Sequence, residues 1–186
     1  FDVRGPLLAI AWHAPPTGHA DAEALDVASE ILSNGRTSRL YRRLVYDAAK
    51  ALFASGGYWE LNRAGVFYAM AGVRPGESVE EVEELFLDEI ARLRRDPVDA
   101  QELEKAKRSL EVGLVNGFDT SHSLASRIAH DYTVFGRIRP LDERLEAIRA
   151  VTAEDVQRVA RTYLVPDQRS IVHVVKRPPA PDEESP

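Results

Sequence analysis

The chain has 186 residues, of which 44% are hydrophobic, and this length and composition suit one globular domain with its own core. It contains no cysteine, which excludes disulfides and thiolate chemistry and leaves His, Asp and Glu as the possible metal ligands. A formal net charge of -6 argues against a nucleic-acid-binding surface, because such binding depends on many Lys and Arg contacts to phosphate.

The chain begins at Phe1 with neither an initiator Met nor a basic and then apolar leader, so we expect it to be a piece of a longer product. Its longest apolar runs, residues 6–12 and 66–73, are far shorter than the roughly 20 residues that a membrane-spanning helix needs. We therefore expect a soluble fragment. Its compartment, a bacterial periplasm or cytoplasm, stays open.

The first part of the chain combines short apolar runs with segments of helical periodicity, and Pro, Asn and Gly separate them. The predicted elements are a strand over residues 7–13, an amphipathic helix over about 21–32, a second helical segment that ends at 47–50, and an antiparallel hairpin with strands over 51–61 and 65–74.

The second part is mostly helical. Ser78 with Glu81, and Thr152 with Asp155, have the spacing of a helix capping box, and Asp99 can cap a further helix. The predicted elements are helices that begin near Ser78, Asp99, Asp119–Ser121, Pro140 and Thr152, followed by a strand over 170–175. We expect the helix after Asp119 to bury an apolar stripe made of Leu124, Ile128, Tyr132 and Phe135.

The order of the elements is strand, helix, helix, two strands, five helices and strand. Strands and helices that are segregated in this way predict an α+β fold, a two-layer sandwich in which helices cover a largely antiparallel sheet. We expect one domain over residues 1–177. Residues 178–186 are Pro, Asp, Glu, Ala and Ser with little to bury, which predicts a disordered tail or linker.

The usual local signatures of catalysis are absent from the sequence: it has no H-E-x-x-H, H-x-x-E-H, G-x-S-x-G, P-loop or G-x-G-x-x-G string. His13 and His19 straddle two prolines, and nothing in the sequence directs both rings to one point. His122 and His130 lie eight residues apart on one predicted helix, too far for a shared metal. We therefore predict no catalytic or metal-binding residue, and a metal hydrolase that uses His122 and His130 is a minor alternative.

Three arginines form the best candidate for a binding site. Arg36, Arg39 and Arg43 are spaced as i, i+3 and i+7, which would place them on one face of a helix. Their guanidinium groups could hold a peptide carboxylate or the acidic groups of a partner through charge-assisted hydrogen bonds. The alternative is that they form salt bridges to the glutamate-rich helices of the same chain.

The same stretch carries a resemblance to a known family. Residues 33–41, Ser-Asn-Gly-Arg-Thr-Ser-Arg-Leu-Tyr after an amphipathic helix, resemble the glycine-rich, Ser-Arg-Leu-aromatic segment of the insulinase/pitrilysin/mitochondrial processing peptidase family. The opening apolar strand that ends in proline, the helix start at 99–107 and the segment 151–156 agree with that resemblance. Together they extend from about Leu7 to Lys176, and the chain looks like the C-terminal member of that family's paired domains.

The resemblance implies a zinc peptidase made of two similar domains that face each other across a chamber, with the H-x-x-E-H helix in the N-terminal domain. It therefore implies that zinc belongs to a partner domain or subunit and not to this chain. Active C-terminal domains of the family usually add an arginine and, seven residues later, a tyrosine. In this sequence those positions hold Val45 and Leu52, and a shift by one residue gives Tyr46 and Phe53. Neither valine nor phenylalanine can donate a hydrogen bond to a developing oxyanion.

From these observations we expect a non-catalytic C-terminal domain of a zinc-dependent metallopeptidase. It would close a peptide-binding chamber against a zinc-bearing domain or subunit, and its partners would be that domain and the peptide substrate. The alternative is a scaffold or interaction module of the same fold that has lost peptidase chemistry. Such a module would use its sheet or the arginine face to hold a partner, as family members in respiratory complexes are thought to do.

Overall fold

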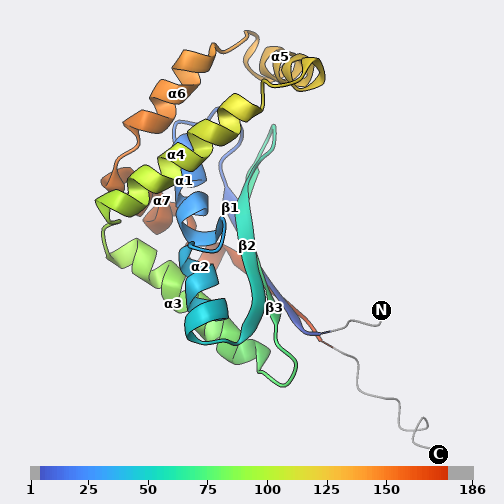
Figure 1. The fold of residues 1–186 in the computed structure, drawn as a ribbon, viewed down its shortest axis with the longest axis vertical. Helices are drawn as coiled ribbons and strands as arrows, with labels where there is room; N and C mark the ends of the chain where they lie inside the picture. Colours follow the sequence, from blue (N-terminus) through green and yellow to red (C-terminus); the bar gives the residue numbers. More distant parts are fainter. Residues whose placement is uncertain (1–4, 176–186) are drawn as a thin grey trace, which may run out of the picture.

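The structure is a computed structural model that describes residues 5–175, so the predicted tail at 178–186 lies outside the described residues. Its elements follow the predicted order (Figure 1). They are β1 (Leu7–Ala14), α1 (Ala22–Ser33), α2 (Arg39–Tyr41), the π-helical turn η1 (Arg42–Asp47), β2 (Ala51–Glu60), β3 (Gly65–Val73), α3 (Val79–Arg95), α4 (Ala100–Asn116), α5 (Ser121–Phe135), α6 (Leu141–Ala150), α7 (Ala153–Tyr163), the 3₁₀ turn η2 (Pro166–Gln168) and β4 (Arg169–Val174).

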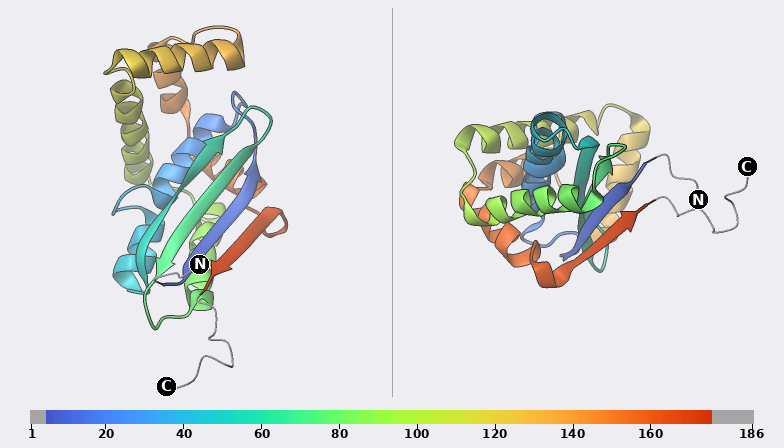
Figure 2. Two further views of the ribbon diagram at one scale, coloured as in Figure 1. Left: turned by 90° about the vertical axis from the view of Figure 1, so that its right-hand side faces the viewer. Right: turned by 90° about the horizontal axis from the view of Figure 1, so that it is seen from below.

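The four strands form one antiparallel sheet in the order β2-β3-β1-β4, so the first and last strands of the chain are neighbours. In this register Leu8 of β1 lies opposite Ala71 of β3 and His173 of β4. The helices cover one face of the sheet and leave the other face open (Figure 2). The predicted α+β class and the two-layer sandwich are confirmed.

Local sequence explains where the helices start. The Ser78 hydroxyl accepts hydrogen bonds from two backbone N–H groups of the first turn of α3, and the Asp99 carboxylate does the same for α4. At α7 the predicted capping box forms in full, because Thr152 and Asp155 exchange side-chain and backbone bonds. Each cap satisfies N–H groups that have no partner within the helix, which fixes the first residue of the helix.

The core lies between the covered face of the sheet and the inner sides of α1, α3, α4 and α7. Alternate residues of β1, namely Leu8, Ile10 and Trp12, face the helices and are fully or almost fully buried. Trp12 packs edge-on against Phe67 of β3, with 6.3 Å between ring centroids. The amphipathic helix predicted over about 21–32 is confirmed as α1, which buries Leu25, Ala28, Ile31 and Leu32.

Two sequence-based expectations were wrong. The second helix begins at Arg39, after Ser38 in an extended conformation, so Arg36 lies in the preceding loop and the three arginines do not share one helix face. On α5 the predicted buried stripe is largely exposed: Leu124, Ile128 and Tyr132 all face solvent. The periodicity located the helix correctly but could not say which of its sides meets the rest of the molecule.

Candidate functional site

The predicted arginine site lies at the start of α2, beside α3 and α4. Arg39 donates from Nε and Nη2 to the two carboxylate oxygens of Glu102, at 2.9 and 2.6 Å. Arg43 lies 3.9 Å from an oxygen of Asp88 on α3, and Arg36 is exposed in the loop. Arg39 is therefore held by a half-buried, bidentate pair within the chain, a geometry that makes such pairs strong.

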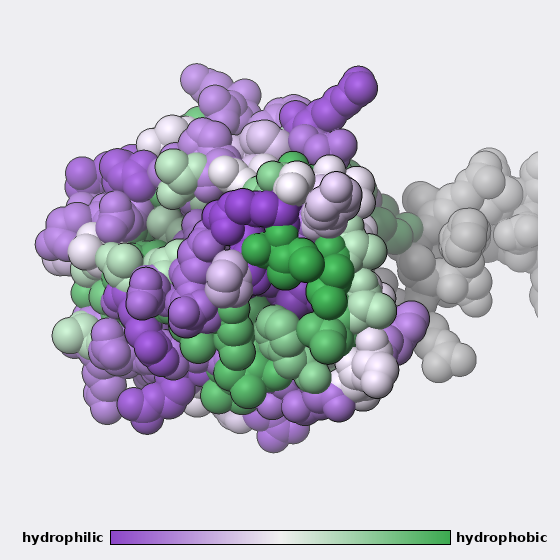
Figure 3. All heavy atoms as spheres, turned by 90° about the horizontal axis from the view of Figure 1, so that it is seen from above, coloured by the Kyte–Doolittle hydropathy of each residue, from purple (hydrophilic) through white to green (hydrophobic). Residues whose placement is uncertain are grey.

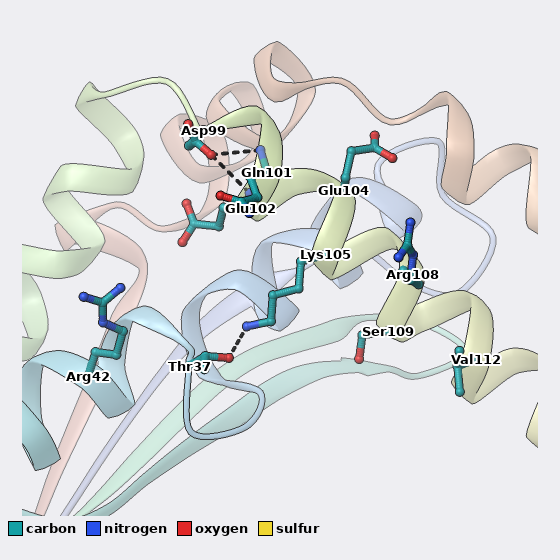
Figure 4. A pocket seen from close by; sticks show the side chains of 10 residues that line it. All are labelled: Thr37, Arg42, Asp99, Gln101, Glu102, Glu104, Lys105, Arg108, Ser109 and Val112. Carbon is teal, nitrogen blue, oxygen red and sulfur yellow. Dashed lines mark hydrogen bonds between the residues drawn. The ribbon is translucent and has the colours of Figure 1, made fainter.

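A hollow of about 910 Å³ opens between that loop and the first turns of α4 (Figure 4). Lys105 reaches from α4 to the Thr37 hydroxyl, and Arg42 and Arg108 flank the opening. The carboxylates of Asp99, Glu102 and Glu104 also line the hollow. Because both signs of charge meet there, the hollow does not present one dominant charge to a ligand.

The two positions that the resemblance assigns to catalysis lie on either side of the start of β2. Val45 is in the π-helical turn and packs against the core. Leu52 is 57% exposed and lies at a β-bulge, where the register shifts between Ala51 and Phe53. The bulge places Leu52 and Phe53 together opposite one residue of β3, and both side chains are exposed.

The open face of the sheet is the largest feature that local sequence reasoning did not find. Its residues alternate with the core residues along each strand. They are Leu7, Ala9, Ala11 and His13 on β1, Phe53, Ser55, Gly57 and Trp59 on β2, Val66, Tyr68, Met70 and Gly72 on β3, and Ser170, Val172 and Val174 on β4. Within the described strands, no Asp, Glu, Lys or Arg lies on this face. We refer to these residues as the open sheet face.

Aromatic side chains lie near both ends of β2 on the open sheet face. Trp59 is 64% exposed, and its ring lies 5.8 Å from that of Tyr68 on the neighbouring strand. The Phe53 ring lies over Gly72, where a Cβ atom would collide with it. The absence of a side chain at Gly72 therefore makes room for the ring. The result is a mainly aromatic and aliphatic surface.

A signal for this surface was present in the sequence. A strand of an antiparallel sheet with one solvated face normally alternates apolar and polar residues. In β3, however, Val66, Tyr68 and Met70 fill the positions between core residues, so both faces of the strand are apolar. Contiguous exposed apolar surface of this kind marks a place where a protein or ligand binds.

Comparison with known proteins identifies the family. Residues 1–110 match the family described as the peptidase M16 inactive domain. The chain belongs to this family. It is 26% identical to the zinc protease PqqE of Helicobacter pylori over 165 residues and 30% identical to a zinc protease of Mycobacterium bovis over 171 residues. These alignments cover 89% and 88% of this chain but 37% of each relative.

Solved structures agree with the family assignment. A protease from Helicobacter pylori superposes with a TM-score of 0.85 at 25% identity, over 94% of this chain and 42% of that one. The inactive peptidase domain of a proposed zinc protease from Bordetella parapertussis gives a TM-score of 0.84 at 23% identity, over 98% of this chain and 97% of that one.

Among sequence relatives, core protein I of the ubiquinol-cytochrome-c reductase complex from Euglena gracilis is 25% identical over 85% of this chain and 37% of that protein.

Two further observations bear on what this M16 inactive domain can hold. Within residues 5–175, no three His, Asp or Glu side chains lie close enough together to bind a metal ion, so His122 and His130 are not part of such a group. No helix in the same range is both long and apolar enough to span a bilayer. The chain spans less than two fifths of the length of the curated relatives it matches.

A cluster of carboxyl groups lies at the end of the sheet near the β2–β3 turn. Burial, together with the charges of Glu60, Glu23 and Glu30, raises the pKa of Asp26 on α1 to about 8. Burial and Glu23 also raise the pKa of Glu60 at the end of β2. A small hollow lined by Asp26, Glu60 and Arg139 joins these groups. The cluster therefore favours at least one protonated carboxyl near neutral pH.

Proposed function

We propose that this chain is the non-catalytic C-terminal domain of a zinc-dependent metallopeptidase. In this proposal it closes a peptide-binding chamber against a zinc-bearing domain or subunit, and the open sheet face forms its wall of the chamber. The zinc ion and the residues that activate water belong to the other domain. The contribution of this chain is to bind the peptide and to exclude water from it.

The single observation that carries the proposal is the uncharged open sheet face. Burying a charged group without a partner is costly, whereas burying apolar surface is favourable by about 25 cal/mol per Å². A face with exposed Trp59, Phe53 and Val172 is therefore suited to be covered by peptide or protein and not by water. The helices pack on the opposite face of the sheet and support it when this face is covered.

The position of Leu52 gives independent support. The resemblance assigns to this position a tyrosine that, in active domains, contacts the scissile peptide. Leu52 is exposed at the bulge of β2 and directly precedes Phe53, a residue of the open sheet face. The site that contacts peptide in active relatives would thus lie next to the proposed wall. Leucine there cannot donate a hydrogen bond, which fits a domain without catalytic residues of its own.

The test is to produce this chain together with the zinc-bearing domain of its parent protein and to measure cleavage of a set of fluorogenic peptides. Trp59→Ser and Val172→Ser remove exposed apolar groups, so folding should be retained. We expect these variants to raise the KM for peptides with apolar side chains about tenfold while zinc content stays unchanged. The matched control is Ile138→Ser, an exposed apolar residue in the loop between α5 and α6, outside the open sheet face.

Two results would contradict the proposal. One is stoichiometric zinc binding with peptidase turnover by the isolated chain. The other is cleavage by the Trp59 and Val172 variants with unchanged kinetics, since the wall would then make no contact with the peptide.

A second candidate function is a scaffold that has lost all connection with proteolysis. The likeness to core protein I of a respiratory complex from Euglena gracilis favours this candidate. In this case the surface around Arg36, Arg39 and Arg43 is a proposed contact for a partner. Arg36→Glu and Arg43→Glu reverse the two charges that are not in the bidentate pair with Glu102. Unchanged association with the partner after this double reversal would argue against the arginine surface.

A further inference from the structure

Helix α5 is attached to the rest of the domain in an unusual way. It has 15 residues and lies across one end of the molecule (Figures 1 and 2). Within the described residues it makes no extensive contact with another helix or strand. Its attachment is concentrated at its C-terminal end, where the Phe135 ring lies against Gly18, a glycine with a positive φ of 79°.

Polar groups occupy the centre of the attached side. Asp131 is 1% exposed and accepts a hydrogen bond at 3.0 Å from the backbone N–H of Arg139. The Arg139 guanidinium lies 3.9 Å from the centre of the Phe135 ring and 3.7 Å from the Asp131 carboxylate. Arg127 is half-buried on the same side, over the ring of Phe118. These contacts fix the rotation of the helix about its axis.

In this orientation the apolar stripe of α5 faces solvent. Leu124 is 39% exposed, Ile128 38% and Tyr132 67%. Val112 and Val115, on the last turns of α4 that lead to α5, are about half exposed as well. We refer to these five residues as the α5 patch. Figure 3, which looks onto this end of the molecule, shows an apolar area enclosed by hydrophilic side chains.

The exposed part of α5 carries no Asp, Glu, Lys or Arg side chain. Arg127 and Asp131 are the only residues of these four types between Ser121 and Phe135, and both are turned toward the domain, whereas His122 and His130 are exposed. Elsewhere on the surface, helices such as α3 present Glu and Arg to solvent. An isolated helix of this length is marginally stable in water, and most helices in proteins gain their stability by packing an apolar side. Within residues 5–175, no element covers the apolar side chains of Leu124, Ile128 and Tyr132.

We propose that the α5 patch docks onto the zinc-bearing companion domain and forms part of the contact that closes the chamber. This inference rests on the proposed function. The matching occupant is an uncharged, apolar surface of that domain, because charged groups placed opposite the patch would lose water without gaining a partner. The aligned relatives contain this region as 37% of their length, so they have enough additional chain to supply such a surface.

A second copy of this chain is a less suitable occupant. Stable protein–protein interfaces bury about 800 Å² on each partner. Five partly exposed side chains on one flank of a helix and the end of another supply only a fraction of that area. Two copies that met through the α5 patch alone would therefore separate at micromolar concentration. A companion domain that also contacts other parts of the chain can bury more area than the α5 patch alone provides.

The experiment compares this chain alone with the same chain bound to the zinc-bearing domain of its parent protein, using hydrogen–deuterium exchange. We expect exchange of the backbone amides of residues 121–135 to slow at least tenfold in the complex. The amides of α3, which already packs against the core, should be unchanged. Exchange at α5 that is equally fast in both samples would overturn the proposal.

Variants give the second measurement. Ile128→Glu combined with Tyr132→Glu places charge on exposed positions of the patch, and Ala91→Glu is the matched control on the exposed side of α3. We expect the double variant to weaken binding of the zinc-bearing domain at least tenfold, with circular dichroism unchanged and the control without effect. Unchanged binding by the double variant, with cleavage still sensitive to Trp59→Ser, would reject the α5 patch but leave the chamber proposal standing.

The remaining outcomes are also decisive. If the unmodified chain does not associate with the zinc-bearing domain at all, the proposed function and this inference both fail. If analytical ultracentrifugation shows that the isolated chain is a dimer that Tyr132→Glu dissociates, the occupant is a second copy, and the inference is wrong.

Discussion

The carboxyl group of Asp26 allows a quantitative test of the electrostatics near the β2–β3 turn. It is half-buried on α1, and burial with the neighbouring charges of Glu60 and Glu23 raises its pKa from 3.8 to about 8. An acid with a raised pKa in the folded state binds its proton more tightly there than in the unfolded chain. Its contribution to stability is therefore fully present below about pH 4 and is lost as the pH rises toward 8.

The perturbation is Asp26→Asn, which keeps the shape of the protonated acid and cannot ionise. Each pKa unit corresponds to about 1.4 kcal/mol, so the difference between 3.8 and about 8 sets a ceiling of roughly 6 kcal/mol. Because the carboxyl is only half-buried and solvent screens its charge, we expect the variant to gain about 1–3 kcal/mol at pH 8.5. At pH 4 we expect almost no difference from the unmodified chain.

The assay is urea denaturation of both chains at pH 4, 6 and 8.5, followed by circular dichroism, with the free energy of unfolding extrapolated to water. Asp119→Asn, an exposed substitution between α4 and α5, is the matched control and should follow the unmodified chain. A gain for Asp26→Asn that is equal at all three pH values would show that packing, and not ionisation, is responsible. A loss of stability at pH 8.5 would refute the reasoning outright.

Three further predictions concern the backbone and the ion pair. Ala49 has a positive φ of 54°, a conformation that costs a residue with a Cβ atom about 1–2 kcal/mol. Ala49→Gly removes this cost but increases the conformational entropy of the unfolded chain. We therefore expect the free energy of unfolding to rise by about 0.5–1 kcal/mol. A lower melting temperature would contradict this. Gly72→Ala should cost about 1–3 kcal/mol, because the new methyl group meets the Phe53 ring, and the cost should fall in a Phe53→Ala background. Arg39→Met should cost about 1–3 kcal/mol, and a double-mutant cycle with Glu102→Gln should return a coupling energy above 0.5 kcal/mol; additive effects would mean that the pair is not a stabilising unit.

The arginine site illustrates where sequence reasoning stops. The sequence predicted a basic cluster next to glutamate-rich helices, and it offered both a binding role and an internal salt bridge. The glutamate that pairs with Arg39 is Glu102, which lies 63 residues further along the chain, so only the tertiary fold brings the two together. The start of α2 at Arg39 also depends on the loop before it, and a pattern of spacings does not report loop geometry. The binding role of Arg36 and Arg43 is still a prediction.

Helix α5 shows the same limit for an apolar pattern. The sequence located the start of this helix near Asp119–Ser121, and in the structure Thr120 caps its start while Gly136 adopts the left-handed conformation at its end. The same periodicity would describe a core helix. Its rotation, however, is set by the contacts of Asp131 with Arg139 and of Phe135 with Gly18, and these two partners lie outside the helix.

The sequence by itself determined the order of helices and strands, the α+β class and the family, because caps, turns and hydrophobic period are local properties and the family motifs keep their order along the chain. The tertiary structure decided which strands are neighbours, that one sheet face is left open and uncharged, and that the α5 stripe faces outward. These features arise from pairings between residues far apart in the chain, such as β1 with β4, and from surface that this domain alone does not cover. A local pattern contains neither kind of information.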